Sequence, residues 1–174
     1  MLPILYKDDQ LVAINKPNGM LVHRTKIAAD TKTVVLQTLR DQLGGQKVYP
    51  VHRLDRKTSG VLIFGLAPNA VAKLQKSLEN NRAEKCYRAI VRGWFPERAT
   101  VDHPLTNDRG KKQEAVTHFR CLQHLEIPIP MGKHATSRYS FIEAFPKTGR
   151  QHQIRKHLNH LRHPIIGDRP HGCN

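Results

Sequence analysis

The first residues of the chain have the pattern of two short β-strands joined by a turn. Residues 4–7 and 11–16 alternate in polarity, and Asp8-Asp9-Gln10 lies between them as a turn. Asn15-Lys-Pro-Asn-Gly, dense in turn-forming residues, ends the second strand. The first 20 residues therefore predict a β-hairpin followed by a turn.

Further strands are indicated by the same period of two. Residues 86–92 place Tyr87, Ala89 and Val91 on one face, and residues 139–145 alternate as Tyr139, Phe141, Glu143 and Phe145. Val61-Leu-Ile-Phe is a continuous apolar run that predicts a buried strand. The segment 116–125 fits the periods of both a strand and a helix in part, and we leave it open.

Three segments show helical spacing. The first is Thr33–Leu43, which Gly44 is placed to end. The second is opened by Pro68, with an apolar face of Val71, Leu74 and Leu78. The third is Gln151–Arg162, with three apolar residues turned inward (Ile154, Leu158 and Leu161) and three basic residues turned outward (Arg155, Lys156 and Arg162). We expect residues 1–174 to form a single domain with an α/β fold of the α+β type, in which helices flank a mixed, mainly antiparallel sheet.

The charge balance narrows the class of partner. The chain has 29 Lys and Arg against 14 Asp and Glu, a net charge of +15. Such a surplus favours a polyanionic partner, because neutralising phosphates releases counterions, although a solubilising basic surface would have the same composition. We expect no membrane attachment, because the start lacks an apolar signal core and no stretch approaches the roughly 20 residues of a span. Three scattered cysteines read as free thiols, which predicts a cytoplasmic protein.

The segment with the most chemistry is Val51–Gly60. It places an aspartate, Asp55, among Arg53, Arg56 and Lys57, directly before the predicted buried strand. Positive neighbours favour the ionised carboxylate, which can act as a nucleophile or general base. By itself, a turn aspartate in surface ion pairs is the more common case.

Two other segments bear on that choice. Lys85–Gly93 carries Tyr87 on a strand among basic residues, and Thr148–Arg155 carries Arg150 at a turn before a helix. Taken singly, Tyr87 is more typical of a packing residue and Arg150 of an arginine in solvent at a helix entry.

Together these segments resemble a known family. His52-Arg-Leu-Asp-x-x-Thr-Ser-Gly is similar to the signature of the large pseudouridine synthase family that modifies ribosomal and transfer RNA. The Tyr87 segment and Thr148-Gly-Arg-x-His-Gln-Ile-Arg, continuing to Gly167-Asp168, resemble its two other motifs in the same order. Asn15–Arg24 and the helix at 34–45 are most similar to members that modify tRNA at position 65.

The resemblance implies an isomerase with neither cofactor nor metal. Asp55 would be the catalytic carboxylate, Tyr87 would stack under the flipped uracil, and Arg150 would pair with Asp55. Arg53 would enter the space left by the base, and His52 would order the loop beside the RNA. The substrate would be tRNA, with ribosomal RNA as an alternative, and a non-catalytic RNA-binding module of the same fold as a third reading.

The basic residues of the third helix are the predicted RNA-binding surface: Arg155, Lys156 and Arg162. Their charge would repel a cation, so we do not expect the nearby histidines to hold a metal. We expect a monomer. Family members usually continue past Gly167-Asp168, so we also expect the fold to be incomplete at the C-terminus.

Overall fold

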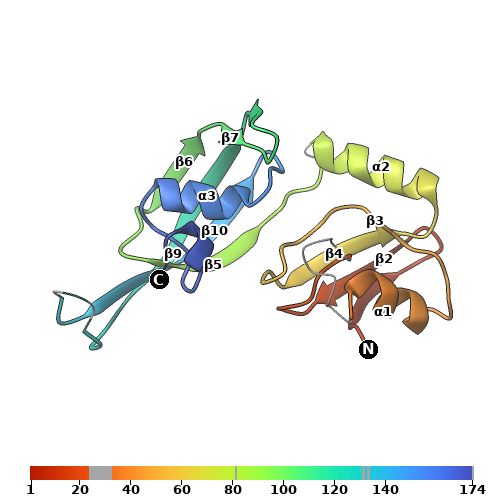
Figure 1. Cartoon of the computed structure of the whole chain (residues 1–174), viewed down its shortest axis with the longest axis horizontal. Helices are drawn as coiled ribbons and strands as arrows, with labels where there is room; N and C mark the ends of the chain where they lie inside the picture. Colours follow the sequence, from red (N-terminus) through yellow and green to blue (C-terminus); the bar gives the residue numbers. More distant parts are fainter. Residues whose placement is uncertain (24–32, 81, 131, 133, 174) are drawn as a thin grey trace. The chain divides into compact units, whose positions relative to one another are not determined.

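The chain folds into two compact units that we describe separately, Met1–Arg82 and Ala83–Asn174 (Figure 1). The computed structural model describes residues 1–23, 33–80, 82–130, 132 and 134–173. Within each unit a four-stranded sheet is accompanied by helices, and the pairs between the named strands of the described residues are antiparallel. These contents confirm the predicted fold class, while the single domain expected from the length stays a prediction.

The sheet of the first unit contains the predicted hairpin. Its strands are β1 (Ile4–Lys7), β2 (Leu11–Lys16), β3 (Tyr49–Pro50) and β4 (Gly60–Gly65). They lie in the order β1-β2-β4-β3, so the hairpin strand β2 pairs with both β1 and β4.

One face of β2 and β4 is closed to solvent. Val12 lies opposite Phe64 and Ile14 opposite Leu62, and none of the four side chains is exposed. The expected continuous burial of the run 61–64 is wrong, because Val61 is 54% exposed. Neighbouring side chains of a strand point to opposite faces, and only alternate residues of this run reach the core.

Two α-helices lie in the described part of the first unit. Helix α1 (Val35–Gln42) is the first predicted helix, slightly shorter at both ends, and Gly44 follows it with a φ of +67°. Helix α2 (Pro68–Glu79) begins with the proline at its first turn, as predicted. It packs on β4 and β3.

The sheet of the second unit has the order β5-β10-β9-β6. Its strands are β5 (Tyr87–Arg92), β6 (Arg98–Asp102), β9 (Val116–Ile127) and β10 (Ser137–Pro146), and a small ribbon pairs β7 (Leu105–Thr106) with β8 (Lys112–Gln113). The segment left open by its periodicity is thus the strand β9.

Helix α3 (Gln153–His160) covers the core of the second unit by contacts with β9 and β10. Leu158 of this helix and Ile142 and Ala144 of β10 are fully buried in one cluster with Val91 of β5. Most of the fully buried side chains of β10 therefore lie on the sheet face opposite to that of Tyr139, Phe141 and Phe145. A short 3₁₀ helix, η2 (Arg169–His171), follows and contacts α3.

None of the helices within the described part of the chain is both long and apolar enough to cross a bilayer.

Candidate functional site

Asp55 lies in a tight turn between β3 and β4. The backbone N–H of Thr58 donates to the Asp55 carbonyl at 3.0 Å and closes the turn. Leu54 is buried beneath it, whereas the neighbouring Arg53 and Arg56 are exposed and Asp55 is half-buried. Gly60 leaves the loop with a φ of +118°, a conformation that side chains other than glycine rarely adopt. The loop thus presents its carboxylate from an anchored backbone.

A second turn, residues 16–20, holds the Asp55 turn in place. Asn18 donates through Nδ2 to the Lys57 carbonyl at 2.6 Å. Gly19 and Arg56 exchange two hydrogen bonds of 2.9 Å, one from the Gly19 N–H and one from the Arg56 Nε. These hydrogen bonds join segments almost 40 residues apart, and in each of them a backbone carbonyl of one turn is the acceptor.

Lys16 is the buried centre of this arrangement and is a residue that the sequence reasoning missed. Its side chain is fully buried, and Nζ donates to the carbonyls of Pro17 (2.9 Å), Met20 (2.8 Å) and Arg56 (3.2 Å). Burial lowers the pKa of Lys16, while the negative charge of Asp55 acts in the opposite direction. The buried ammonium is therefore within electrostatic reach of the carboxylate. The strand period offered a signal, because Lys16 continues the inward face of Val12 and Ile14.

His52 anchors the start of the loop to β4. The N–H of Ile63 donates to Nε2 of His52 at 3.3 Å, and the N–H of Val51 donates to the Ile63 carbonyl at 3.0 Å. Gln75 of α2 adds a hydrogen bond of 3.2 Å to the Val51 carbonyl.

Tyr87 begins β5 opposite Ala144 of β10. Its half-buried side chain packs against the core cluster of the second unit. Tyr87 thus has the position of a packing residue with part of its surface accessible.

Arg150 is fixed at the turn before α3 by both its backbone and its side chain. Nε donates to the Glu114 carbonyl at 2.8 Å. The N–H donates to Oε1 of Gln153 at 3.0 Å, and the Thr148 hydroxyl donates to the same oxygen at 2.7 Å. Gln153, 4% exposed, also binds the Val116 carbonyl, so a glutamine that the sequence reasoning passed over connects this turn to β9.

The predicted basic face of the third helix is only partly present. Arg155 was expected to point outward, but its Nε and Nη2 each lie 2.7 Å from an oxygen of Asp168. Burial raises the Asp168 pKa, but hydrogen bonds and charge from Arg155 outweigh it and lower the pKa overall. Arg162 lies beyond the end of α3 with a φ of +61°, exposed, because the helix is shorter than expected. Lys156 is on α3 and half-buried.

The histidines of this region are held by protein groups. His157 contacts the Thr117 hydroxyl at 2.9 Å and the His103 carbonyl at 3.1 Å. His152 contacts His171 at 3.0 Å. Over the residues that the structure describes, no three His, Cys, Asp or Glu side chains gather in a way that could bind a metal ion.

The fold and motifs agree with one known family. The model of RNA pseudouridylate synthases matches residues 10–160, which include the Asp55 and Tyr87 segments and the Thr148–Arg155 part of the third motif. The chain belongs to the RNA pseudouridylate synthase family. Membership confirms the predicted resemblance and makes the protein an RNA-modifying isomerase.

Relatives of this synthase match over almost the whole chain. The tRNA pseudouridine synthase C of Salmonella typhimurium is 50% identical over 183 residues, covering 99% of this chain and 70% of the relative. The tRNA pseudouridine synthase C of Vibrio cholerae is 49% identical, covering 99% and 75%. Among solved structures, human RNA Pseudouridylate Synthase Domain Containing 4 is similar with a TM-score of 0.75 and 27% identity, covering 97% of this chain and 68% of that one.

Proposed function

We propose that this synthase converts a uridine of tRNA, at position 65 by resemblance, to pseudouridine, with Asp55 as its catalytic carboxylate. The observation that carries the proposal is the Asp55 turn, which the buried Lys16 fixes through the Arg56 carbonyl. The chain that contains this turn is 50% identical to a tRNA pseudouridine synthase C. A carboxylate on a fixed backbone can be positioned against one sugar and one base, which catalysis by proximity requires.

The reaction rearranges bonds within one nucleotide. The C1′–N1 bond breaks, the uracil turns, a C1′–C5 bond forms, and the proton on C5 moves to solvent while N1 gains one. No electrons pass to a second substrate, so the reaction needs no redox cofactor, and the family resemblance implies no metal. Asp55 could add to the base, attack C1′, or abstract a proton from the sugar, and each route needs an ionised carboxylate.

The remaining site residues have supporting roles in this proposal. Tyr87 stacks under the flipped uracil and takes up the C5 proton, and Arg150 pairs with Asp55. Arg53, whose side chain is exposed, fills the space of the flipped base, and His52 orders the loop.

Electrostatics supports a nucleic acid as the substrate. The net charge of +15 favours phosphate contacts, and Lys156 and Arg162 remain candidates for them. Arg155 is placed in this proposal as a support for the Gly167-Asp168 segment, because its guanidinium is held by Asp168. We further propose that the protein acts as a monomer in the cytoplasm, where its tRNA substrate is found.

The proposal is tested by Asp55→Asn. The change is nearly isosteric and removes the charge, so we expect tritium release from C5-labelled uridine in tRNA to fall at least a thousandfold, with tRNA affinity within a few-fold of wild type. Asp9→Asn, in the exposed turn of the first hairpin, is the matched control and should keep full activity. Retention of a tenth of wild-type turnover by Asp55→Asn would remove Asp55 from the chemistry.

The same assay separates the alternative functions. Tritium release from ribosomal RNA but not from tRNA by the wild-type chain would move the substrate to ribosomal RNA. Tight tRNA binding with no release from either RNA would favour a non-catalytic binding module.

A further inference from the structure

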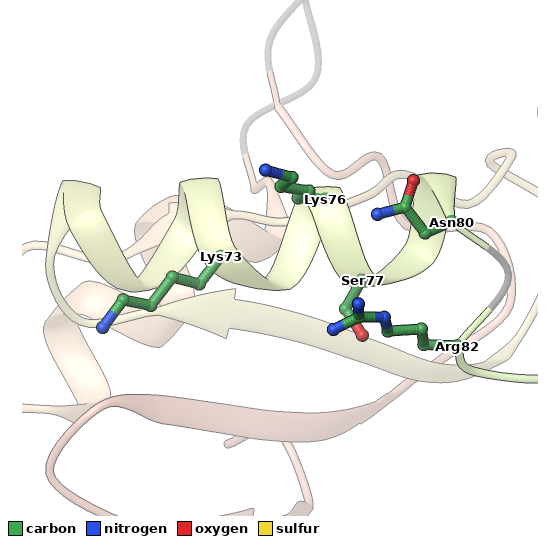
Figure 2. A pocket seen from close by; sticks show the side chains of 5 residues that line it. All are labelled: Lys73, Lys76, Ser77, Asn80 and Arg82. Carbon is green, nitrogen blue, oxygen red and sulfur yellow. The ribbon is translucent and has the colours of Figure 1, made fainter.

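A basic groove lies along α2 and the residues that follow it in the first unit, and it contains none of the residues assigned above. Five residues line it, and its volume is about 280 Å³. Figure 2 shows their side chains on α2 and on the chain that follows it. The lining residues are Lys73, Lys76, Ser77, Asn80 and Arg82.

Helical geometry gathers four of these residues. Positions 73, 76, 77 and 80 are three and four residues apart, so they follow one stripe of the helix. The apolar residues Val71, Leu74 and Leu78 form the partly buried side of α2. Lys73, Lys76 and Asn80 are exposed, whereas Ser77 is half-buried on the side of α2 that also buries Ala70, so the groove lies on the exposed side of the helix and reaches its edge.

Arg82 joins the stripe because the chain folds back after the helix. The backbone N–H of Arg82 donates to the Ser77 carbonyl at 3.0 Å, a capping hydrogen bond of the kind that commonly closes the C-terminal end of a helix. This bond brings a third cationic residue beside Ser77. The site thus depends on the helix ending at this point as well as on its sequence.

The lining has the chemistry of an anion site. Three cations and two neutral groups that can donate hydrogen bonds line the groove, and Glu79, the acidic residue of α2, is not among them. The negative end of the helix dipole lies here, which disfavours anions, so the side chains and not the backbone amides must supply the attraction. Flexible ammonium groups suit the spread charge of a phosphate.

The helix that carries the groove is firmly seated. Gly65 of β4 lies so close to α2 that a Cβ built on it would be 2.6 Å from Cγ2 of Val71 and 3.1 Å from the Val71 nitrogen. Gln75 fixes the same helix to the Asp55 loop through the Val51 carbonyl. Lys73 and Lys76 are therefore presented by a helix tied to the loop that carries the catalytic carboxylate.

We propose that this groove binds a backbone phosphate of the RNA substrate, outside the flipped nucleotide. The proposal rests on the proposed function, because it takes RNA as the partner. Its role is to position the RNA and add affinity, with no part in the bond changes, since contacts to phosphate orient a protein on its nucleic acid.

The test compares two double variants with the same net charge. Lys73→Gln with Lys76→Gln removes the groove lysines, and Lys7→Gln with Lys47→Gln removes two exposed lysines elsewhere in the first unit. For the groove variant we expect tRNA affinity to fall about tenfold at about 0.1 M salt, and the slope of log K against log salt to shrink by about one to two. The control variant should change both quantities much less. Thermal unfolding of both should match wild type, and the single variant Lys76→Gln repeats the test with a smaller change.

Three outcomes would overturn the inference. These are equal losses of affinity in the two double variants, an unchanged salt slope in the groove variant, or a slower single-turnover rate at saturating tRNA without a change of affinity. Failure of the proposed function is seen separately, as absence of C5 tritium release by the wild-type chain at saturating tRNA.

Discussion

Lys16 shows how a single buried charge can fix a loop. An ammonium group has three N–H donors, and Lys16 uses them on the carbonyls of Pro17, Met20 and Arg56. Burying a cation is costly, and these bonds together with the negative charge of Asp55 offset that cost. One side chain thereby determines where two turns meet.

Replacing Lys16 by methionine tests this role. The change keeps the length and apolar stem but leaves the three carbonyls without this donor, at about 1–3 kcal/mol for each one left unsatisfied. We expect the free energy of unfolding to fall by about 3 kcal/mol or more, measured by urea unfolding with far-ultraviolet circular dichroism. Lys7→Met, at an exposed position of β1, should stay within about 0.5 kcal/mol of wild type. An unfolding midpoint equal to that of wild type would show that water replaces the ammonium at no cost.

At the scale of elements, the contact between α2 and β4 depends on a residue without a side chain. Gly65 ends β4 beneath Val71, and α2 starts three residues later at Pro68. The strand and the helix can approach this closely because no Cβ lies between them. The glycine is needed here for space and not for its backbone angles.

Gly65→Ala should therefore be destabilising. The added methyl would overlap Val71, and overpacking of this kind costs about 1–3 kcal/mol. Gly149→Ala is the matched control, because a Cβ there meets no atom within 4 Å. The two variants should differ in thermal midpoint by several degrees, and equal midpoints would mean that α2 moves without cost.

The element α3 illustrates what helical period leaves undecided. The pattern identified Leu158 as inward, which is confirmed, yet it placed Arg155 in solvent. Arg155 instead forms a two-pronged ion pair with Asp168, with side chains only 19% and 9% exposed. The period describes the direction of a side chain around the helix axis, and the partner comes from a segment that the period does not cover.

At the scale of the whole molecule, a buried polar network ties together distant parts of the second unit. His157 of α3 meets the Thr117 hydroxyl of β9 and the His103 carbonyl, and Gln153 donates to the same hydroxyl at 2.9 Å. A carbonyl can only accept, so Nε2 of His157 donates to the His103 carbonyl. When the ring is neutral, Nδ1 is then the acceptor for the Thr117 hydroxyl. Burial lowers the His157 pKa, and so do the charges of His103 and His160, while the hydrogen bond to the His103 carbonyl and the charge of Asp102 raise it.

The sign of the resulting pH dependence follows from that lowered pKa. The unfolded chain binds a proton at His157 below about pH 6.5, and the folded chain does so only at lower pH. The contribution of His157 to the free energy of unfolding is therefore fully present above about pH 6.5, and it is lost as the pH falls from there through the pKa of His157 in the folded chain.

We expect His157→Gln to weaken this dependence. Unfolding is measured at about pH 7.5 and about pH 5.5 by the fluorescence of Trp94, the one tryptophan of the chain, which lies in the second unit. The wild-type unit should lose stability between the two pH values, and the variant should be less stable at the higher pH but lose less. Burial also lowers the pKa of His171, which is present in both the wild type and the variant, so part of the pH dependence of stability remains in the variant. His23→Gln, at an exposed position, should behave as wild type. An undiminished pH response in His157→Gln would assign the effect to other groups.

The sequence alone determined those features of this protein that are local along the chain. Period two predicted β1, β2 and β5, period 3.6 predicted the three helices, and the ordered motifs around Asp55, Tyr87 and Arg150 identified the family. Each strand, helix and single motif rests on residues within about a dozen positions of one another, where backbone geometry alone relates side chains. The family followed from the order of the motifs along the chain, which is also read without a structure.

Only the tertiary structure decided which side chains meet across long separations. The Lys16 side chain reaches the Arg56 carbonyl 40 residues away. The burial of a lysine was hidden because hydrophobic pattern treats charge as a mark of the surface, whereas a buried charge is stable wherever the fold supplies enough partners. The ion pair of Arg155 could not be predicted from the helical period, because Asp168 lies outside the helix and becomes a neighbour of Arg155 only in the folded chain.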